Sequence, residues 1–579
     1  MNLLLVNLTR FGDLLQTQPV VHGLRAQGHR VGLVCLENFA GAAALLEGVD
    51  HVASLPGSAL LAGVQPGGDW RICTAGLMTW ADRLRSAYAH DAVLNLTATL
   101  GGRLLARLLA GNGSGGGDGG DLRGFGLDPF GFGVNADPWS AFLQASTRQR
   151  GCSPFNLVDL FRMAAGVGGV DPVYALRAPL PDALADAGAR LAQAAPPGHA
   201  GYVAMQLGAS EERRRWPVAH FAALAARLWR ELRLVPILLG AGGERTLGER
   251  LRAALAEDAA TTGADQVPCI DLIGATSLPQ LAATLRHMRL LVTNDTGTMH
   301  LAAGLDVPVL AIFLATAQPW DTGPYREDCC CLEPALDCHP CPFGAPCPHA
   351  ERCRHVISAA TVFDLARSQL AAGGWPQGNP TADAPREARV WRTLREANAG
   401  PAAVSNASLP MPGRGFMDLV SLSGHEDEDR TRWIRLQRHF YRQFLDRSDP
   451  PAAPHPADQT AEPRSGHSLW PPQGPCALSD AVRTRAVDEL RQADALLHLM
   501  GEQGGLLKVR PSDMAKSRFL GTVGRVQALW DNSGLFNVLG HLWLCESQGA
   551  GGALDSVLAL AAAYRGLVRA WLAHLEASA

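Results

Sequence analysis

The 579-residue sequence predicts an α/β protein: two parallel-stranded domains, a Pro-rich segment and an all-α C-terminal module. Short apolar runs alternate with amphipathic stretches over residues 1–172, and the same alternation returns over residues 173–372. Strands that alternate with helices indicate βαβ units and hence parallel sheets. The third observation is a change of character after residue 372, where this alternation stops.

The first α/β domain, residues 1–172, has expected strands at 3–6, 30–35 and 92–96 and an amphipathic helix over 14–25. A Gly-rich stretch at 111–137 interrupts the alternation. Its composition predicts a flexible surface insertion or a mobile loop over a cleft. Residues 171–182 contain several prolines and are expected to link the two domains.

The second α/β domain, residues 173–372, has the more regular pattern. We expect strands at 202–206, 234–239, 269–272, 290–293 and 308–313, and helices at 218–232, 245–256 and 278–286. Ser277 and Gln280 have the spacing of a capping box at the start of the last helix.

The remaining 207 residues divide in two. Residues 373–480 are rich in Pro, Ala, Gly and Ser, which predicts a largely disordered linker with one helical island over 429–447. Residues 481–579 show helical periodicity and form a predicted all-α module, available to bind a protein partner.

Charge and hydropathy exclude several classes of protein. A net charge of −4 argues against a general nucleic-acid binder. No apolar run reaches the roughly 18 residues of a membrane span, and polar residues follow residues 1–6 too soon for a signal peptide. We therefore expect a cytoplasmic protein. Only Lys508 and Lys516 among the 51 basic residues are lysine, which we attribute to genomic composition.

Several strand-to-helix turns carry residues suited to chemistry, because ligands of open α/β sheets bind at the carboxyl ends of strands. After the first strand, Gly12 permits a tight turn, and Asp13 stands at the start of a helix, which favours its ionised form. The alternative is that Asp13 serves only as a helix cap.

In the second domain, the turn after strand 202–206 ends in three arginines, residues 213–215, and predicts an anion site or a solvated basic turn. Glu244 follows a glycine turn. Its carboxylate is placed either to accept hydrogen bonds from a ribose or to complement the positive end of the helix dipole. The turn after 290–293 is the densest in functional groups, with Asp295, Thr296, Gly297 and His300 within six residues.

Three segments, in this order and at these separations, resemble glycosyltransferase family 9, the ADP-heptose:lipopolysaccharide heptosyltransferases and their relatives. They are LLLVNLTRFGDLLQTQPVVHGLR, GASEERRRWPVAHFAALA and LLVTNDTGTMHLAAGLDVPVLAIF. The resemblance covers about residues 1–370. It implies a GT-B architecture, with two Rossmann-like domains facing across a cleft.

The resemblance also implies roles for individual residues. Asp13 matches the catalytic base, Arg214 a phosphate-binding position usually occupied by lysine, and Asp295 the aspartate that binds sugar hydroxyls. The other implied substrate-binding positions are Thr9, Gly12, Ser210, Glu244, Thr296, Gly297 and His300.

The implied reaction is a single inverting displacement that needs no divalent metal. A heptose or related sugar would move from an ADP-sugar to a lipopolysaccharide core or other surface glycan, with peripheral association at the inner membrane. Asn7, where many members carry arginine, and the 111–137 insertion depart from the family pattern. Alternatives are a polypeptide acceptor recruited by the C-terminal extension, as in autotransporter heptosyltransferases, and a non-catalytic binding scaffold.

Seven of the 13 cysteines lie between Cys329 and Cys353. In a reducing compartment, clustered cysteines more often bind metal than form disulfides. The spacing of the last four favours a structural Zn or Fe ion held by thiolates, with disulfides or free thiols as the alternative. The four predicted ligands are Cys338, Cys341, Cys347 and Cys353.

Overall fold

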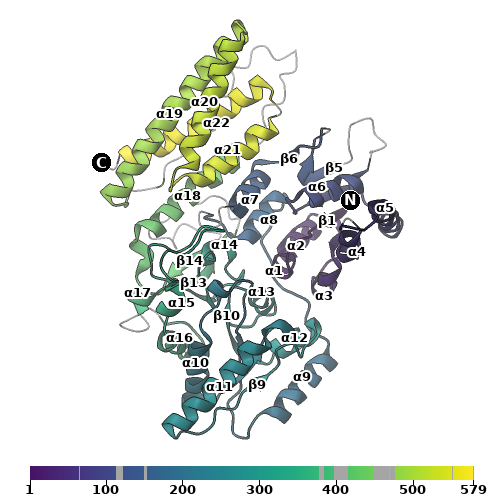
Figure 1. Ribbon diagram of the computed structural model, residues 1–579, viewed down its shortest axis with the longest axis vertical. Coiled ribbons are helices and arrows are strands. Elements are labelled where there is room, and N and C mark those ends of the chain that lie inside the picture. Colours follow the sequence, from purple (N-terminus) through teal and green to yellow (C-terminus); the bar gives the residue numbers. More distant parts are fainter. Residues whose placement is uncertain are drawn as a thin grey trace. The chain divides into compact units, whose positions relative to one another are not determined.

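The computed structural model describes residues 1–63, 65–111, 121–128, 130–148, 153–376, 384–396, 415–446, 469, 472, 476–550 and 552–577. These residues divide into two compact units (Figure 1). Unit 1 comprises Met1–Arg123, Phe155–Ala397 and Arg414–Glu426, and unit 2 comprises Gly124–Pro154, Asn398–Gly413 and Asp427–Ala579. Each unit is described by itself.

The N-terminal half of unit 1 is built on four parallel strands in the order β3-β2-β1-β4. They are β1 (Asn2–Val6), β2 (Arg30–Leu36), β3 (His51–Leu55) and β4 (Ala92–Asn95). Leu3, Leu4, Leu5 and Val6 are all fully buried, as expected of a central strand covered on both faces. Because the order reverses beside β1, the carboxyl ends of β1 and β4 form the switch point of this sheet.

The predicted helix over residues 14–25 is two helices, α1 (Phe11–Leu15) and α2 (Gln18–Ala26). Pro19 lies in the first turn of α2, where its missing N–H costs no hydrogen bond. The other helices of this half are η1 (Glu37–Phe39), α3 (Ala40–Ala43), α4 (Gly57–Ala62), α5 (Trp70–Ala87) and α6 (Leu100–Ala110).

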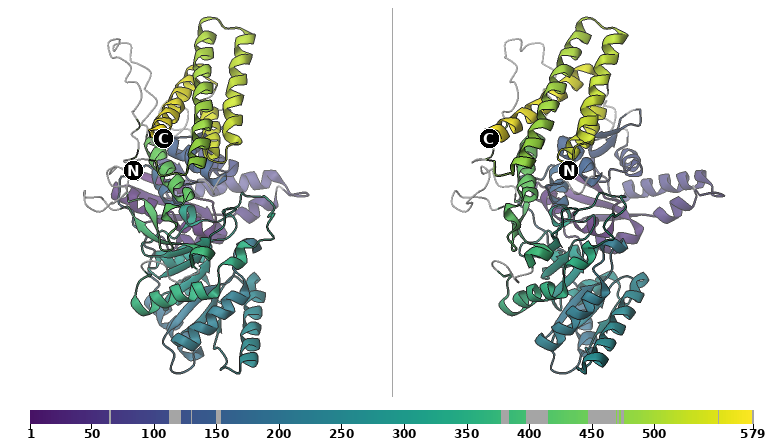
Figure 2. Two further views of the ribbon diagram at one scale, coloured as in Figure 1. Left: turned by 90° about the vertical axis from the view of Figure 1, so that its left-hand side faces the viewer. Right: turned by 60° about the vertical axis from the view of Figure 1, so that its left-hand side comes forward.

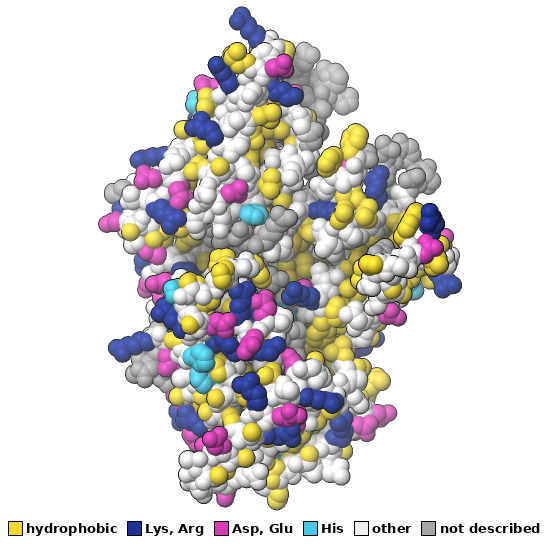
Figure 3. Space-filling view, in the orientation of Figure 1, with side chains coloured by type: hydrophobic (Ala, Val, Ile, Leu, Met, Phe, Trp, Pro, Cys, Tyr) yellow, Lys and Arg dark blue, Asp and Glu magenta, His cyan; other side chains and the backbone are white. Residues whose placement is uncertain are grey.

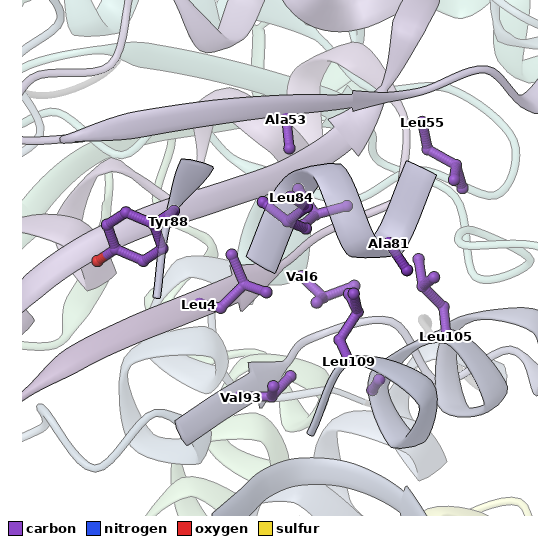
Figure 4. Close-up of a cluster of buried hydrophobic side chains, with 12 residues drawn as sticks. Leu4, Val6, Ala53, Leu55, Ala81, Leu84, Tyr88, Val93, Leu105 and Leu109 are labelled. Atoms are coloured by element: carbon purple, nitrogen blue, oxygen red, sulfur yellow. The ribbon is translucent and has the colours of Figure 1, made fainter. Parts of the chain in front are cut away.

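Apolar side chains from both strands and helices form the core of this half (Figure 4). Leu4 and Val6 of β1 meet Leu84 of α5 and Leu105 of α6 there. Tyr88 follows α5 and packs on Gly32 of β2, where a Cβ would lie 2.6 Å from the ring. A side chain at Gly32 would displace the ring.

The C-terminal half of unit 1 has a sheet in the order β9-β8-β7-β10-β11-β12-β13-β14, in which β13 and β14 are antiparallel to their neighbours. Its switch point lies between β7 and β10. The strands are β7 (Tyr202–Gln206), β8 (Val235–Leu239), β9 (Ile270–Asp271), β10 (Met288–Asn294), β11 (Val309–Ile312), β12 (Cys330–Pro334), β13 (Ala388–Arg395) and β14 (Met417–Ser421).

The helices predicted at 218–232 and 278–286 begin and end within one residue of those positions, whereas the helix predicted at 245–256 continues to Thr262. The predicted capping box at the start of α12 is confirmed, because Gln280 Oε1 accepts a hydrogen bond from Ser277 N at 2.8 Å. The helices are α8 (Leu157–Ala164), α9 (Pro181–Ala194), η3 (Glu212–Arg214), α10 (Val218–Leu232), η4 (Gly242–Glu244), α11 (Arg245–Thr262), α12 (Leu278–Leu285), α13 (Gly297–Gly304), α14 (Pro319–Thr322), α15 (Cys353–Val356), α16 (Ala359–Ala372) and α17 (Ala384–Glu387).

Within residues 373–480, the predicted helical island over 429–447 is confirmed by α18 (Asp429–Leu445). The prediction that the rest is largely disordered is wrong for residues 388–395 and 417–421, which form strands. Strand β13 pairs antiparallel with β12, and β14 pairs with β13, so both extend the second sheet. Within β13, Val390 and Trp391 are fully buried. These two short strands were not predicted because the prediction used the average composition of the whole segment, which is rich in Pro, Ala, Gly and Ser. Strand β12 was also missed, because its CCLEP sequence was assigned to the cysteine cluster.

Unit 2 contains a β-hairpin and a helical bundle. Strands β5 (Asp121–Leu127) and β6 (Gly133–Asn135) pair antiparallel, so part of the predicted flexible insertion is ordered. Residues 112–120 and 129 of that insertion lie outside the described residues. The helices are α7 (Pro138–Arg148), α18 (Asp429–Leu445), α19 (Asp480–Val509), α20 (Asp513–Asp531), α21 (Asn537–Gly549) and α22 (Leu554–Glu576), and η5 (His425–Asp427) precedes α18.

Aromatic packing holds the bundle together. Trp571 of α22 stacks on Trp433 and Phe440 of α18, with ring centroids 5.4 Å and 4.9 Å apart. Helices α19 and α20 run side by side in both views of Figure 2. Helix α22 is also the one described helix long and apolar enough to cross a membrane, by length and composition alone.

A buried ionic cluster ties α8 to Tyr325 and to the start of β14. Arg162 Nη1 lies 3.0 Å from Asp159 Oδ1, and both side chains are at most 1% exposed. Tyr325 donates a 2.6 Å hydrogen bond to the same carboxylate, whose other oxygen accepts from Met417 N at 2.9 Å. Burial and the neighbouring Asp159 charge raise the pKa of Tyr325.

We predict that Arg162→Met lowers the free energy of unfolding by about 3–5 kcal/mol, because it removes a buried cation from the buried Asp159 carboxylate. The control Arg252→Met removes a largely exposed ion pair with Asp271 and should cost at most about 1 kcal/mol. Chemical denaturation of both variants measures the difference. Equal losses would show that the buried cluster contributes no more than a surface pair.

Candidate functional site

The predicted site residues gather at the carboxyl ends of β1, β7, β8 and β10, all within unit 1. Residues 7–13 follow β1 at the first switch point. Residues 206–214 and 294–300 follow β7 and β10, which flank the second switch point. Crevices outside the carboxyl ends of parallel strands at such points are where open α/β sheets bind ligands.

The turn after β1 touches the start of α13. A Cβ added to Gly12 would lie 2.9 Å from His300 Cδ2 and 3.2 Å from Gly297 Cα. A Cβ on Gly297 would lie 2.2 Å from the ring of Phe11 and 3.3 Å from Gly12 N. The two halves of unit 1 therefore meet backbone to backbone here, because neither glycine carries a side chain.

Asp13 stands one residue beyond this contact, half-buried in the first turn of α1. The N-cap residue of α1 is Arg10, so Asp13 is not the cap. Among the described residues, its carboxylate forms no hydrogen bond or ion pair. Thr9 is held to the end of β1 by a hydrogen bond, which its N–H donates to Asn7 Oδ1 at 3.0 Å.

Arg214 and Asp295 form an ion pair with each other across the second switch point. Each side chain is 7% exposed. Arg214 Nη1 also donates to Ser210 Oγ at 3.0 Å, whereas its buried Nε has no hydrogen-bond partner in the described part of the chain. The structure thus brings together three predicted substrate-binding residues.

Glu244 caps its own turn and also reaches the neighbouring strand. Its Oε2 accepts hydrogen bonds from Ala241 N at 2.9 Å and from Gln206 Nε2 at 3.2 Å. Gln206 Oε1 in turn accepts from Thr298 Oγ1 at 3.1 Å. Gln206, which the sequence analysis did not select, therefore links the β8 turn to α13.

Asn294 is a second residue that the sequence analysis did not select. Its Nδ2 donates to the carbonyls of Leu207 and Gly208 at 3.0 Å and 3.2 Å, and its Oδ1 accepts from Trp216 N at 2.8 Å. One buried amide thus fixes the whole turn from β7 to α10 against β10. A polar residue at the end of an apolar strand was the available signal.

The first turn of α13 is ordered from three sides. Thr296 is its N-cap residue and lies 3.2 Å from Thr293 through their Oγ1 atoms. The ring of His300 contacts the Gly12 turn, and Tyr174 donates a 2.9 Å hydrogen bond to the His300 carbonyl. The first N–H groups of a helix lack intrahelical partners and bind anions well.

The four predicted metal ligands lie in and beside the loop that precedes α15. Burial raises the pKa of Cys341, and Coulombic interaction with Cys353, Cys338 and Cys347 raises it further, so the four side chains lie near one another. Cys341 N donates to Ala315 O at 2.8 Å. Nevertheless, in the described residues no three His, Cys, Asp or Glu side chains converge in a way that would hold a metal ion.

Comparison with known proteins identifies one family. Residues 170–349 match the sequence model of glycosyltransferase family 9 (heptosyltransferase). Lipopolysaccharide heptosyltransferase 1 of Pseudomonas aeruginosa is 36% identical over 169 residues, which is 29% of this chain and 44% of that protein. Lipopolysaccharide heptosyltransferase 2 of Salmonella typhimurium is 36% identical over 100 residues, or 17% and 27%. The matches thus span less than half of these relatives.

Among solved structures, ADP-heptose lps heptosyltransferase II of E. coli is similar with a TM-score of 0.45 and 16% sequence identity. This match covers 64% of the present chain and 99% of that chain.

We predict that Gly297→Ala destabilises the protein by about 1–3 kcal/mol, as overpacking does, because the new methyl group would collide with Phe11. Gly101→Ala is the matched control: it lies in the first turns of α6 with no atom within 4 Å of the added Cβ. Thermal unfolding of both variants measures the effect. A Gly297→Ala variant as stable as the control would contradict the close approach.

Proposed function

We propose that this chain, whose residues 170–349 form a glycosyltransferase family 9 domain, transfers a heptose or a related sugar from an ADP-sugar donor to a lipopolysaccharide core or other surface glycan. The curated relatives that support this proposal are named as lipopolysaccharide heptosyltransferases. We place the reaction at the cytoplasmic face of the inner membrane, where a peripheral enzyme reaches a glycolipid acceptor.

The observation that carries the proposal is the contact between the Gly12 turn and the start of α13. It brings the Gly12 turn, which the half-buried Asp13 follows directly, against the first turn of α13 at the junction of two α/β halves. Proton abstraction needs a base, and departure of a diphosphate needs positive potential. This junction supplies both within a few residues of each other.

In the proposed reaction, Asp13 removes the proton from the acceptor hydroxyl as that oxygen attacks the anomeric carbon of the donor. The carboxylate suits this role because, among the described residues, no cation or hydrogen-bond donor engages it. The attack proceeds from the side opposite the nucleotide, so the configuration at the anomeric carbon inverts.

The leaving ADP gains negative charge as its bond to the sugar breaks. The first N–H groups of α13 and the guanidinium of Arg214 stabilise that charge, and no divalent metal is required for this step. Asp295 accepts hydrogen bonds from sugar hydroxyls. Because Asp295 and Arg214 pair with each other in the free protein, donor binding replaces a contact between them with contacts to the sugar and the phosphates.

Glu244 is the residue proposed to contact the nucleoside. Its two hydrogen bonds fix the carboxylate beside Gly208, where a Cβ would lie 1.5 Å from Glu244 Oε1. The glycine at position 208 therefore leaves room for this carboxylate at the end of β7.

We predict that Asp13→Asn lowers the rate of sugar transfer about a hundred- to ten-thousand-fold and leaves donor affinity nearly unchanged. The amide keeps the size of the side chain but cannot accept the proton. Release of ADP in the presence of acceptor measures the rate, and thermal shift with ADP-sugar measures binding.

Asp182→Asn is the control for this prediction, because Asp182 likewise stands in the first turn of a helix, α9, away from the site. It should transfer at the rate of the unmodified protein. Retained turnover in Asp13→Asn would remove Asp13 from the role of base. Absence of any ADP release from the unmodified protein, with glycan or polypeptide acceptors, would overturn the proposed function itself.

We also propose that Cys338, Cys341, Cys347 and Cys353 hold a structural Zn or Fe ion. The donor set supports this, because four neighbouring thiols match the preference of both metals for thiolate ligands. The proposal requires these side chains to turn toward a common point, since they do not converge on one in the described conformation. The ion would fix the loop after β12.

We predict about one metal ion per chain in protein purified without chelators, measured by elemental analysis, and its loss in a Cys338→Ser/Cys347→Ser double variant. Cys35→Ser is the control, because Cys35 lies buried in β2 and should not change the metal content. A folded, metal-free unmodified protein would contradict the proposal.

A further inference from the structure

The end of the α19–α20 hairpin in unit 2 exposes several large apolar side chains to solvent. We call residues 505–520 the hairpin tip. Four of its apolar side chains are more than half exposed: Leu506 at 65%, Val509 at 77%, Met514 at 66% and Leu520 at 54%. Isolated exposed apolar residues are ordinary, but four within 15 positions of one hairpin end form a patch.

The same tip concentrates positive charge. Its cations are Lys508, Arg510, Lys516 and Arg518, all exposed, against one acid, Asp513. The whole chain has a net charge of −4, so this local excess runs against the overall balance. Both lysines of a chain with 49 arginines lie here, and composition alone does not account for that clustering.

The bundle does not cover the tip. Helix α22 packs against α19 at Gly504, where a Cβ would lie 2.3 Å from Leu558. Beyond this contact, α19 continues to Val509 and turns at Pro511 into α20, with Phe519 as the buried residue of the tip. One contact returns to the bundle, an ion pair between Lys508 and the exposed Asp555 at the start of α22.

The far end of the hairpin in Figure 3 shows this combination directly, with dark blue Lys and Arg side chains beside yellow apolar ones. Apolar side chains interleaved with Lys and Arg are the pattern of segments that lie in the interface of a bilayer. The apolar groups enter the region between headgroups and acyl chains, while the cations meet anionic headgroups.

We propose that the hairpin tip docks on an anionic phospholipid surface. Charge complementarity selects this occupant, since four cations suit a surface of phosphate groups. A nucleic acid would also attract the cations but gives no partner to exposed Leu, Val and Met side chains. The inference does not depend on the sugar-transfer reaction, because no residue of the tip belongs to the proposed active site.

The test uses the full-length protein and sedimentation with two kinds of vesicle: phosphatidylcholine alone, and phosphatidylcholine mixed with phosphatidylglycerol. We expect at least tenfold stronger binding to the mixed vesicles, weakened by salt. Replacing Lys508, Arg510, Lys516 and Arg518 with Gln should lower this binding at least tenfold. A triple Leu506→Ser/Val509→Ser/Met514→Ser variant should lower it as well.

Matched controls carry the same changes elsewhere. Replacing Arg485, Arg491, Arg525 and Arg569 with Gln removes four exposed cations from the body of the bundle, and Leu180→Ser removes an apolar side chain that is 74% exposed in unit 1. Both controls should bind mixed vesicles like the unmodified protein. Circular dichroism should show unchanged helix content in every variant.

Three outcomes would overturn the proposal. The unmodified protein fails to bind mixed vesicles, the tip variants bind as well as the controls, or the tip variants change only the oligomeric state seen by light scattering. The last result would assign the tip to contact between protein copies. Transfer to a soluble acceptor fragment should be the same in tip variants and unmodified protein, so loss of docking and failure of the proposed function are distinguishable.

Discussion

The backbone contact between Gly12 and Gly297 is the constraint on which the arrangement of the site depends. It joins the switch points of two sheets that are far apart in the sequence, and it leaves no room for a Cβ at either position. Asp13, Thr296 and His300 are placed by this contact, since each lies within three residues of one glycine. The placement of Asp13, the proposed base, relative to the start of α13 therefore depends on two glycines that carry no side chain.

Buried polar groups extend that constraint through the C-terminal half of unit 1. Asn294 fixes the β7 turn, Gln206 links Glu244 to Thr298, and Arg214 pairs with Asp295. Removing any one of them would leave partners buried without hydrogen bonds, which is costly in a low-dielectric interior. The hydrogen bonds of Asn294 and Gln206 order the β7 turn and the proposed substrate-binding residue Glu244 in the free protein, which reduces the conformational entropy lost on binding.

The part of the chain after residue 372 has two different characters. Its first part completes the second sheet through β13 and β14, within unit 1. Its last hundred residues form a helical bundle together with α18, and the aromatic core of that bundle surrounds Trp571. The chemistry and the proposed lipid docking thus lie in separate units, which share a chain but no residues. Such a division allows one part to change without disturbing the other.

The sequence alone determined most strands of the two α/β halves, the helix boundaries near Val218 and Leu278, and the strand-to-helix turns that carry the predicted site residues, because these depend on local periodicity and capping. It did not predict β3 or β12. Only the tertiary structure decided that the Gly12 turn meets Gly297, that Arg214 pairs with Asp295 and that β13 joins β12. Each of these is a contact between residues far apart in the chain, and local pattern carries no information about such pairing.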